Sequence, residues 1–519
     1  MGGDRDRKPF EAWLRREFIE NKLNTPFGYA LMIFCALAIS YIFATAGLVA
    51  AIVVAVLVIG APMAVGSMFN LRFGVILITV IAYFVLGIKR YAEQVPLGLA
   101  VDVLTAIMFL GLFIKQVRER DWSFAKNPIT TMVILWMLYS IAMIANPAAP
   151  SRIAYIYVIR SMAGLMAMYF IISYAINRFG FVVQLTNTLV FLLLLAALYG
   201  LKQEFIGFSD YERHWVTSDP MRYDLYFIWG RMRIFSFFSD PSIFGILMAC
   251  GGMFSFVLAM GPYSLAKRIF FGFSSMMLLA AMVFAGTRTA YVILPVAFFF
   301  FSFLSMRRDV LIICGACIFL GGLYVLKNPQ NPVVYRIYSA FLPGKDESYQ
   351  VREENQKFIQ PFIQSHPLGG GLGSTGVWGA RFSPHHFLAK FPPDSGYVMI
   401  AVEMGWIGLL IYCWMLFVAF REGVKRYFRA RSDIIKNYYA AFLVLLIGMT
   451  IANFAQLVFT QTPGNLTFFI ILAVLANLIK FDHQLAPKAS LALEQQEADM
   501  PKVLVPAARN SEHIKHIET

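Results

Sequence analysis

Residues 181–203 have the sequence FVVQLTNTLVFLLLLAALYGLKQ, an almost uninterrupted apolar stretch. A helix needs about 20 mostly apolar residues to cross the hydrocarbon core of a bilayer, so this stretch is long enough to span one. Further apolar runs lie at approximately 27–47, 48–68, 73–88, 97–116, 128–146, 153–176, 237–261, 268–286, 290–306, 309–327, 395–420, 436–457 and 465–481. The sequence therefore predicts an all-α, polytopic membrane protein with about 12–14 transmembrane helices.

The composition of the whole chain supports this assignment. Of its 519 residues, 59% are hydrophobic and only 14% are charged, whereas soluble domains average about 45–50% apolar and about 25% charged residues. A soluble enzyme, a disordered chain and a fibrous protein are thereby excluded. The net charge of +14 need not indicate a nucleic-acid partner, because cytoplasmic loops of membrane proteins favour Lys and Arg and anionic lipids attract them; no nucleic-acid partner is expected.

Positive charge also predicts the orientation of the chain. Basic connections alternate with less basic ones along the sequence, and they contain Lys115–Arg120, Lys267–Arg268, Arg307–Arg308 and Arg421–Arg431. Placing these connections in the cytoplasm, as the positive-inside bias requires, puts both termini inside. The long polar breaks 204–236 and 328–394 then face outward. Lys89–Arg90 is the exception, because this pair would also lie outside.

The two ends of the chain are predicted to lie outside the membrane core. Residues 1–26 contain an apolar stripe that includes Phe10, Trp13 and Phe18, and we expect a cytoplasmic amphipathic helix on the inner leaflet. Residues 482–519 are polar and aperiodic, which is typical of a disordered tail. The transmembrane domain is expected to occupy residues 27–481.

The first outer break combines arginines with aromatic residues. Between Glu204 and Arg233 it contains Tyr211, Arg213, His214, Trp215, Arg222, Tyr223, Tyr226, Trp229 and Arg231. Guanidinium groups form planar forks that match phosphate oxygens, and aromatic faces suit sugar rings or the membrane boundary. An interfacial aromatic belt with solvated arginines is the alternative. Clustered positive charge on the outer side opposes the inside bias, which favours an anion site.

Two short motifs at the ends of apolar runs extend this region. Asp240-Pro241-Ser242 is typical of a helix start, with Asp240 as the cap and Pro241 in the first turn, and it leaves Arg233 near the membrane edge. The turn Gly286-Thr287-Arg288 separates two apolar runs. Arg288 could extend to the interface, or, if the turn enters the bundle, it would be a buried cation that requires an anionic partner.

The second outer break begins with a predicted helix over Glu347–Ser365, which has Arg352 and Lys357 on its polar side. His366-Pro-Leu-Gly-Gly-Gly-Leu-Gly-Ser-Thr-Gly376 follows and contains a literal GxGxxG. A dinucleotide site would require a preceding strand and a following helix in a parallel sheet, and neither is predicted here. A turn that brings backbone N–H groups to a phosphate stays open as an alternative.

The same break ends with Arg381, His385 and His386, followed by Asp394-Ser-Gly-Tyr397 at the start of the next apolar run. The Asp394 carboxylate could accept a proton from a hydroxyl, or it could cap the helix that follows.

Three charged residues lie inside predicted spans and are costly unless they have partners. Glu403 lies deeper in the span that follows Asp394. Asp102 and Arg160 lie on two other spans, where they could pair with each other.

Taken in order, these motifs resemble the O-antigen ligase and polymerase superfamily of bacterial envelope glycosyltransferases. The resemblance covers roughly residues 180–420. It rests on Arg233…Asp240-Pro241-Ser242, the Gly-Thr-Arg288 turn, the helix with Arg352, the HPLGGGLG segment, and Asp394-Ser-Gly-Tyr397 leading into AVEMGWIGLL.

The resemblance implies a GT-C-like fold in which residues 27–481 form the glycosyltransferase domain. It implies transfer of a glycan from undecaprenyl pyrophosphate to an acceptor hydroxyl on a glycan or lipid, with inversion. This would occur at the periplasmic face of the bacterial inner membrane, without a metal or other cofactor. Arg233 and Arg288 would hold the pyrophosphate, and Asp394 would orient or deprotonate the acceptor. The remaining substrate-binding residues would be Arg231, Arg352, Arg213, Arg222, Tyr397, His366 and Arg381.

One position departs from the ligase pattern. Ligases of this family usually carry His followed by Asn or Ser where this chain has Asp394-Ser395, and the aspartate favours the polymerase side. His366, His385 or His386 could supply an imidazole instead. A lipid-linked oligosaccharide transporter or flippase is the alternative function. It would place ionisable groups and broken helices near the midplane, whereas most outer charge here lies in two loops at one face.

Overall fold

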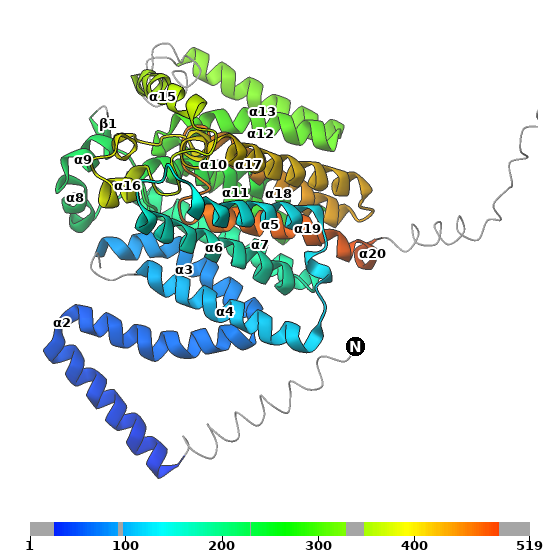
Figure 1. The fold of residues 1–519 in the computed structure, drawn as a ribbon. Helices are drawn as coiled ribbons and strands as arrows, with labels where there is room; N and C mark the ends of the chain where they lie inside the picture. Colours follow the sequence, from blue (N-terminus) through cyan, green and yellow to red (C-terminus); the bar gives the residue numbers. More distant parts are fainter. Residues whose placement is uncertain (1–24, 92–96, 229, 329–346, 487–519) are drawn as a thin grey trace, which may run out of the picture.

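The computed structural model describes residues 25–91, 97–228, 230–328 and 347–486 as a bundle of long helices (Figure 1). Within these residues, 12 helical segments are long and apolar enough to cross a membrane. They lie in α3 (Leu71–Tyr91), α4 (Leu97–Glu119), α5 (Pro128–Ala142), α6 (Arg152–Ala175), α7 (Phe179–Phe205), α10 (Pro241–Ala259), α11 (Leu265–Ala285), α12 (Arg288–Ser305), α13 (Arg308–Lys327), α17 (Gly396–Arg429), α18 (Asp433–Ala452) and α19 (Gly464–Asn477). The all-α polytopic fold is confirmed.

The first predicted pair of spans differs from the prediction. Residues 27–47 and 48–68 belong to one helix, α2 (Pro26–Phe69), which Figure 1 shows bent into two arms. The sequence around the expected boundary, Ala44-Thr-Ala-Gly-Leu48, contains only one glycine and no charged residue. Such a junction lacks the polar and proline-rich residues that usually terminate a helix, so the helix continues through it.

α10 is the most central of the helices that carry the site, and it packs against α11, α12 and α18. Two of its glycines permit close approach to neighbouring helices. A Cβ atom added at Gly251 would lie 2.7 Å from Leu193, and one at Gly252 would lie 2.5 Å from Leu279. Small residues serve this purpose in membrane bundles, where packing rather than water exclusion brings helices together.

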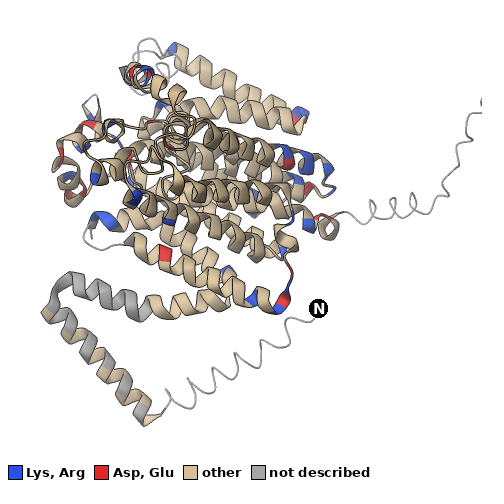
Figure 2. Cartoon of the chain, in the orientation of Figure 1, with Lys and Arg blue, Asp and Glu red and all other residues tan. Residues whose placement is uncertain are grey.

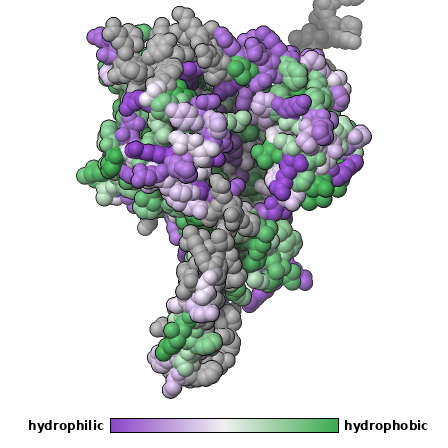
Figure 3. Space-filling view, turned by 90° about the vertical axis from the view of Figure 1, so that its left-hand side faces the viewer, coloured by the Kyte–Doolittle hydropathy of each residue, from purple (hydrophilic) through white to green (hydrophobic). Residues whose placement is uncertain are grey.

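The two long polar breaks lie at the same end of the bundle, which we call the loop-bearing end (Figure 1). The first forms α8 (Asp210–Thr217), α9 (Pro220–Tyr226) and a hairpin of β1 (Phe227–Ile228) and β2 (Arg231–Met232), with Phe227 opposite Met232. The second contributes α15 (Glu347–Ser365) and α16 (Gly376–Phe382). Figure 3 looks onto this end and shows hydrophilic residues spread across it.

The opposite end carries many cations, as Figure 2 shows. Basic residues lie there in the connections around Lys115–Arg120, Lys267–Arg268, Arg307–Arg308 and Arg421–Arg431. Beyond α19 the chain continues into α20 (Asp482–Leu485). The buried Asp482 carboxylate accepts hydrogen bonds of 2.9 Å from the backbone N–H groups of Arg431 and Ser432. The described chain thus extends past the predicted boundary at 482. The predicted amphipathic segment and the rest of the tail fall on 1–24 and 487–519, outside the described residues.

The glycine-rich segment after α15 enters the bundle beside a break in α17. Gly405 has φ 68° and interrupts the helix, and the N–H of the next residue, Trp406, donates to the carbonyl of Pro367 at 2.9 Å. Gly370 and Gly371 in turn donate to backbone carbonyls of α17 at 2.7 and 2.9 Å. A Cβ atom added at Gly405 would lie 1.9 Å from the Pro367 oxygen, so only glycine fits at this crossing.

Glu403 explains why this segment is rich in glycine. Its buried carboxylate accepts hydrogen bonds from the N–H of Gly373 (3.1 Å) and from the N–H (3.2 Å) and hydroxyl (2.6 Å) of Thr375. Successive N–H groups in such a turn form a concavity that favours an anion, and φ at Gly371 and Gly373 is 91° and 76°. The partner that Glu403 was predicted to need is therefore this loop. The open alternative of a phosphate there is wrong, because a protein carboxylate fills the concavity.

This arrangement predicts that Glu403→Gln destabilises the protein. The amide nitrogen would face an N–H group that now donates to a carboxylate, and a buried donor without an acceptor costs about 1–3 kcal/mol. Thermal unfolding of the purified protein should show a lower midpoint than for Glu353→Gln, a matched change on the exposed face of α15. Equal midpoints for the two variants would contradict the buried anion site.

Candidate active site

The start of α10 has the predicted cap. One carboxylate oxygen of Asp240 accepts from the N–H groups of Ser242 and Ile243, each at 2.9 Å, and the other accepts from the Ser239 hydroxyl at 2.7 Å. Pro241 occupies the first helical turn. Asp240 therefore acts as an N-cap, and it fixes the segment that follows Arg233.

Arg233 lies directly after β2 and is buried, with 5% of its surface exposed. Its Nε donates to the carbonyl of Ala285 at 2.8 Å, and its two terminal nitrogens donate to the carbonyl of Leu225 at 3.2 Å and to the Thr287 hydroxyl at 3.0 Å. The guanidinium thus joins the first loop to the turn between α11 and α12. Arg233 and the Gly-Thr-Arg288 turn, distant in sequence, are in direct contact.

The start of α12 lacks the usual side-chain cap. Thr287 occupies the N-cap position, but its hydroxyl accepts from Arg233 and donates to the carbonyl of Pro241 at 2.9 Å instead. Arg288 is the first residue of the helix and is half-buried. A helix N-terminus carries a partial positive charge and attracts anions. Arg233, Arg288 and the helix end therefore make this corner of the structure electropositive.

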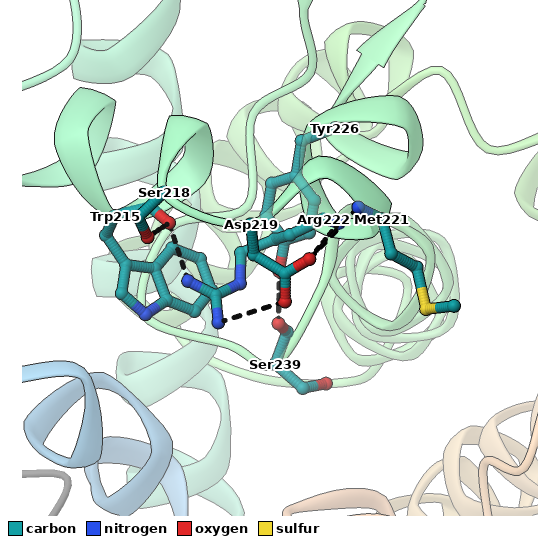
Figure 4. Close-up of polar contacts among 7 residues, drawn as sticks. All are labelled: Trp215, Ser218, Asp219, Met221, Arg222, Tyr226 and Ser239. Carbon is teal, nitrogen blue, oxygen red and sulfur yellow. Dashed lines mark hydrogen bonds and ion pairs between the residues drawn. The ribbon is translucent and has the colours of Figure 1, made fainter.

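Tyr226 lies among several charged groups of the first loop. Its hydroxyl donates to the carbonyl of Ser239, and the ring is buried (Figure 4). Burial raises the pKa of Tyr226, the Asp240 carboxylate raises it further, and Arg90, Arg222 and Arg233 oppose the rise. Three arginines from separate segments consequently act on one phenol.

Arg222 is held within the loop (Figure 4). It donates to the carbonyl of Trp215 at 2.6 Å, lies 4.0 Å above the Trp215 ring and forms an ion pair with Asp219 at 3.7 Å. Arg231 pairs with Glu204 at 2.8 Å near the surface, and Arg213 is exposed on α8. The contacts of Arg222 and Arg231 place these two guanidinium groups against protein carboxylates.

Sequence reasoning missed Arg90 as a member of this region. It lies at the end of α3, has 7% of its surface exposed and donates to the carbonyls of Ser236 (2.7 Å) and Phe238. Its guanidinium lies 4.4 Å from the Phe235 ring centre, which is within cation–π range. The only signal in the sequence was that Lys89–Arg90 contradicted the orientation rule. The structure confirms that Arg90 lies at the loop-bearing end and gives the reason, since it packs into the first loop.

A second cluster surrounds Asp394. This residue is exposed, and the side-chain amide of Asn355 on α15 donates to its carboxylate at 3.5 Å. Arg352, Asn355 and the fully buried Ile359 have i, i+3, i+7 spacing and lie on one face of α15. Ser395 occupies the N-cap position of α17. The alternative in which Asp394 caps this helix is therefore not realised, and the carboxylate faces the surface.

The remaining predicted residues lie around these clusters. The His366 ring stacks on Phe362 at 4.1 Å, Arg381 is exposed on α16, and the Tyr397 hydroxyl donates to the carbonyl of Thr450 at 3.0 Å. The predicted pair of Asp102 and Arg160 is confirmed, with 3.0 Å between its nitrogen and oxygen atoms. Among the described residues, no three His, Cys, Asp or Glu side chains lie together as a metal site would need.

The structure therefore groups the predicted residues into two clusters at the loop-bearing end. One contains Arg233, the turn with Arg288, and Asp240, and the other contains Asp394 with Asn355 and the face of Arg352. Helix packing connects them, because α18 contacts α10, α12 and α17. Guanidinium groups, a helix N-terminus and a separate exposed carboxylate are suited to bind an anion and to accept a proton.

A family model described as O-antigen ligase matches residues 273–413. This span runs from α11 into α17 and includes Arg288, Arg352 and Asp394, whereas Arg233 precedes it. A search of curated proteins gives no match. Residues 273–413 are thus similar to O-antigen ligases, which is consistent with a member of the O-antigen ligase and polymerase superfamily that the motifs resemble.

Proposed function

We propose that the protein transfers glycan from an undecaprenyl-pyrophosphate-linked donor to an acceptor hydroxyl, and that it acts as a polymerase rather than as a ligase. The observation that carries this proposal is the contact between Arg233 and Thr287, at the N-terminus of α12. It brings two arginines from separate loops to one helix end, where a pyrophosphate would be favoured. The similarity of residues 273–413 to O-antigen ligases supports the reaction class.

In this proposal the loop-bearing end faces the periplasm. The cationic connections at the opposite end support this orientation, since Lys and Arg favour the cytoplasmic side. Both the N-terminal side of α3 and the end of α19 then lie in the cytoplasm.

The donor's isoprenoid chain would lie against the bundle. An apolar groove of about 930 Å³ lies between α3, α7 and α11. Phe84, one of its lining residues, contacts Phe237 with 4.7 Å between ring centres. Phe237 lies on the segment between Arg233 and Asp240, so the groove leads towards the proposed pyrophosphate site.

The chemistry follows from the donor. The acceptor oxygen attacks the anomeric carbon from the face opposite the pyrophosphate, the bond from this carbon to the phosphate oxygen breaks, and the electron pair leaves with the pyrophosphate. This leaving group needs its charge stabilised rather than a proton, and fixed guanidinium groups in a partly dry site do this effectively. We assign this role to Arg233 and Arg288 and expect no metal to be required.

Asp394 would take the proton that the acceptor hydroxyl loses. Its carboxylate is exposed at the surface of the loop-bearing end, and Asn355 orients one of its oxygens. Arg352, one turn from Asn355 on the same face of α15, would bind phosphate or sugar beside it. In this proposal Arg233 and Arg288 stabilise the leaving group, and Asp394, on a different loop, supplies the base.

A lipid-linked oligosaccharide flippase is the alternative, and the break in α17 favours it, because transporters often use broken helices. The glycine-rich segment occupies this break and Glu403 binds it. The broken backbone is therefore buried in protein rather than lining a path, which supports the enzyme.

Replacing Arg288 by Ala is expected to lower the rate of glycan transfer by about 10²–10³-fold, as removal of a group that stabilises developing charge does. Arg233→Ala should have a similar effect, and it should also lower the melting temperature because Arg233 is buried. Lys at either position should restore little activity, since it lacks the planar fork. Transfer is measured with purified protein and lipid-linked donor.

Arg307→Ala is the matched control for these variants. Arg307 is exposed at the opposite end and pairs with Asp309, so this change should leave transfer unaltered. Full activity of both Arg233→Ala and Arg288→Ala would rule out the pyrophosphate clamp.

For Asp394→Asn, we expect turnover to fall by about 10²–10⁴-fold, the usual contribution of a general base. The melting temperature should stay the same, because the side chain is exposed. Asp433→Asn, an exposed change at the opposite end, serves as the control. Unchanged turnover in Asp394→Asn would remove the proposed base.

Incubation of the protein with donor alone distinguishes the two reaction types. A polymerase produces a ladder of longer lipid-linked glycans, because the donor also serves as acceptor. If the donor stays unchanged when it is alone, and is consumed only after a separate lipid acceptor is added, the protein is a ligase. That result would contradict this part of the proposal.

A further inference from the structure

Three aromatic rings meet between α6 and α16. Tyr157 on α6 stacks on both Trp378 and Phe382 of α16, with ring centres 4.9 and 5.2 Å apart and interplanar angles of 26° and 27°. Trp378 and Phe382 are nearly parallel to each other, at 10°. All three rings are half-buried, so each keeps part of its surface exposed. We call this group the aromatic platform.

An ion pair borders the aromatic platform. Arg160, one turn beyond Tyr157, lies 5.8 Å from the Tyr157 ring centre and bonds Asp102 of α4 at 3.0 Å. The two side chains lie about 12 and 8 Å along their helices from the loop-bearing end. They nevertheless keep 43% and 27% of their side-chain surface exposed. The two charges satisfy each other, and the exposed part of the pair leaves polar atoms that a ligand can contact.

The helix that carries two rings of the aromatic platform begins close to the proposed base. A Cβ atom added at Gly376, the first residue of α16, would lie 3.8 Å from Pro393, which precedes Asp394. The glycine-rich segment fixes α16 in this place, since a Cβ atom at Gly373 would lie 3.0 Å from Val158 of α6. Glu403 binds the same segment through Gly373 and Thr375. The glycine-rich segment thereby places the start of α16, the helix of Trp378 and Phe382, beside the residue that precedes Asp394.

From this juxtaposition we propose that the aromatic platform, with Arg160 and Asp102, binds a neutral sugar ring of the acceptor glycan; this inference rests on the proposed function. The C–H face of a pyranose packs on flat aromatic surface. Its neighbouring hydroxyls donate to the Asp102 carboxylate and accept from the Arg160 guanidinium. This holds the acceptor so that its terminal hydroxyl reaches Asp394.

The charges of the ion pair favour a sugar over an anionic lipid headgroup as its occupant, while a further cation of α16, Arg381, lies 5.4 Å from the Phe382 ring centre. Arg160 is neutralised by Asp102, and the carboxylate would repel a phosphate at the same place. A neutral ring with several hydroxyls uses both the acceptor and the donor of the pair, and it leaves the ion pair intact.

Binding is tested with the full chain in lipid nanodiscs, without donor. The probe is a repeat-unit oligosaccharide released by mild acid from the envelope polysaccharide of the producing cells. Saturation-transfer NMR should show saturable binding to the wild type. Trp378→Ala and Asp102→Asn should each weaken it about tenfold, since each removes one favourable contact. Trp378→Phe, which keeps a ring, and Trp122→Ala, which removes a stacked ring at the opposite end, should bind like the wild type.

Kinetics separate this inference from the proposed function. In transfer assays, Trp378→Ala should raise KM for the acceptor about tenfold while kcat stays within about twofold. Suppose that the wild type transfers glycan, but that Trp378→Ala and Asp102→Asn have the same acceptor KM and oligosaccharide affinity as the wild type. This result would overturn the sugar site and leave the proposed function standing. A wild type that binds the oligosaccharide as described but transfers nothing would support the sugar site and overturn the proposed function. Loss of oligosaccharide binding in nanodiscs enriched in anionic lipid, with binding retained in neutral lipid, would assign the platform to lipid headgroups and overturn the inference.

Discussion

The guanidinium of Arg233 holds the loop-bearing end together. It joins the carbonyl of Leu225 in the first loop to Ala285 and Thr287 in the turn before α12. Because Thr287 uses its hydroxyl to bind Arg233 and Pro241, it leaves the first turn of α12 without a side-chain cap. One buried cation thereby fixes the loop beside the positive end of a membrane helix.

A second buried ionic contact fixes the other half of the same end. The Glu403 carboxylate binds the N–H groups of the glycine-rich segment within the broken part of α17. This segment places α16 against α6, and α16 begins beside the residue that precedes Asp394. Non-helical backbone is tolerated within a membrane bundle only where it is buried in protein or lines a cavity, and Glu403 supplies the buried partner here. The position of the proposed base thus depends on a residue two turns deeper in the helix.

Sequence predicted the contacts that have a local physical cause. Asp240 caps α10 because Asp-Pro-Ser contains its own cap and first turn, and Asp102 pairs with Arg160 because each is costly in a span alone. The contacts that sequence could not predict join distant segments. Arg90 packs against Ser236, and nothing in either segment indicates that they meet. The glycine-rich segment binds a carboxylate of its own chain rather than a phosphate, and both anions suit the same concavity equally well.

Binding of undecaprenyl pyrophosphate without any glycan tests the central claim most directly. Affinity is measured on the full chain in nanodiscs, with undecaprenyl monophosphate as the comparison ligand. The account predicts that the wild type binds the pyrophosphate more tightly than the monophosphate, and that Arg288→Ala loses this preference, because the arginines and the helix end recognise charge on the second phosphate. Equal affinity of wild type and Arg288→Ala for both lipids would contradict it.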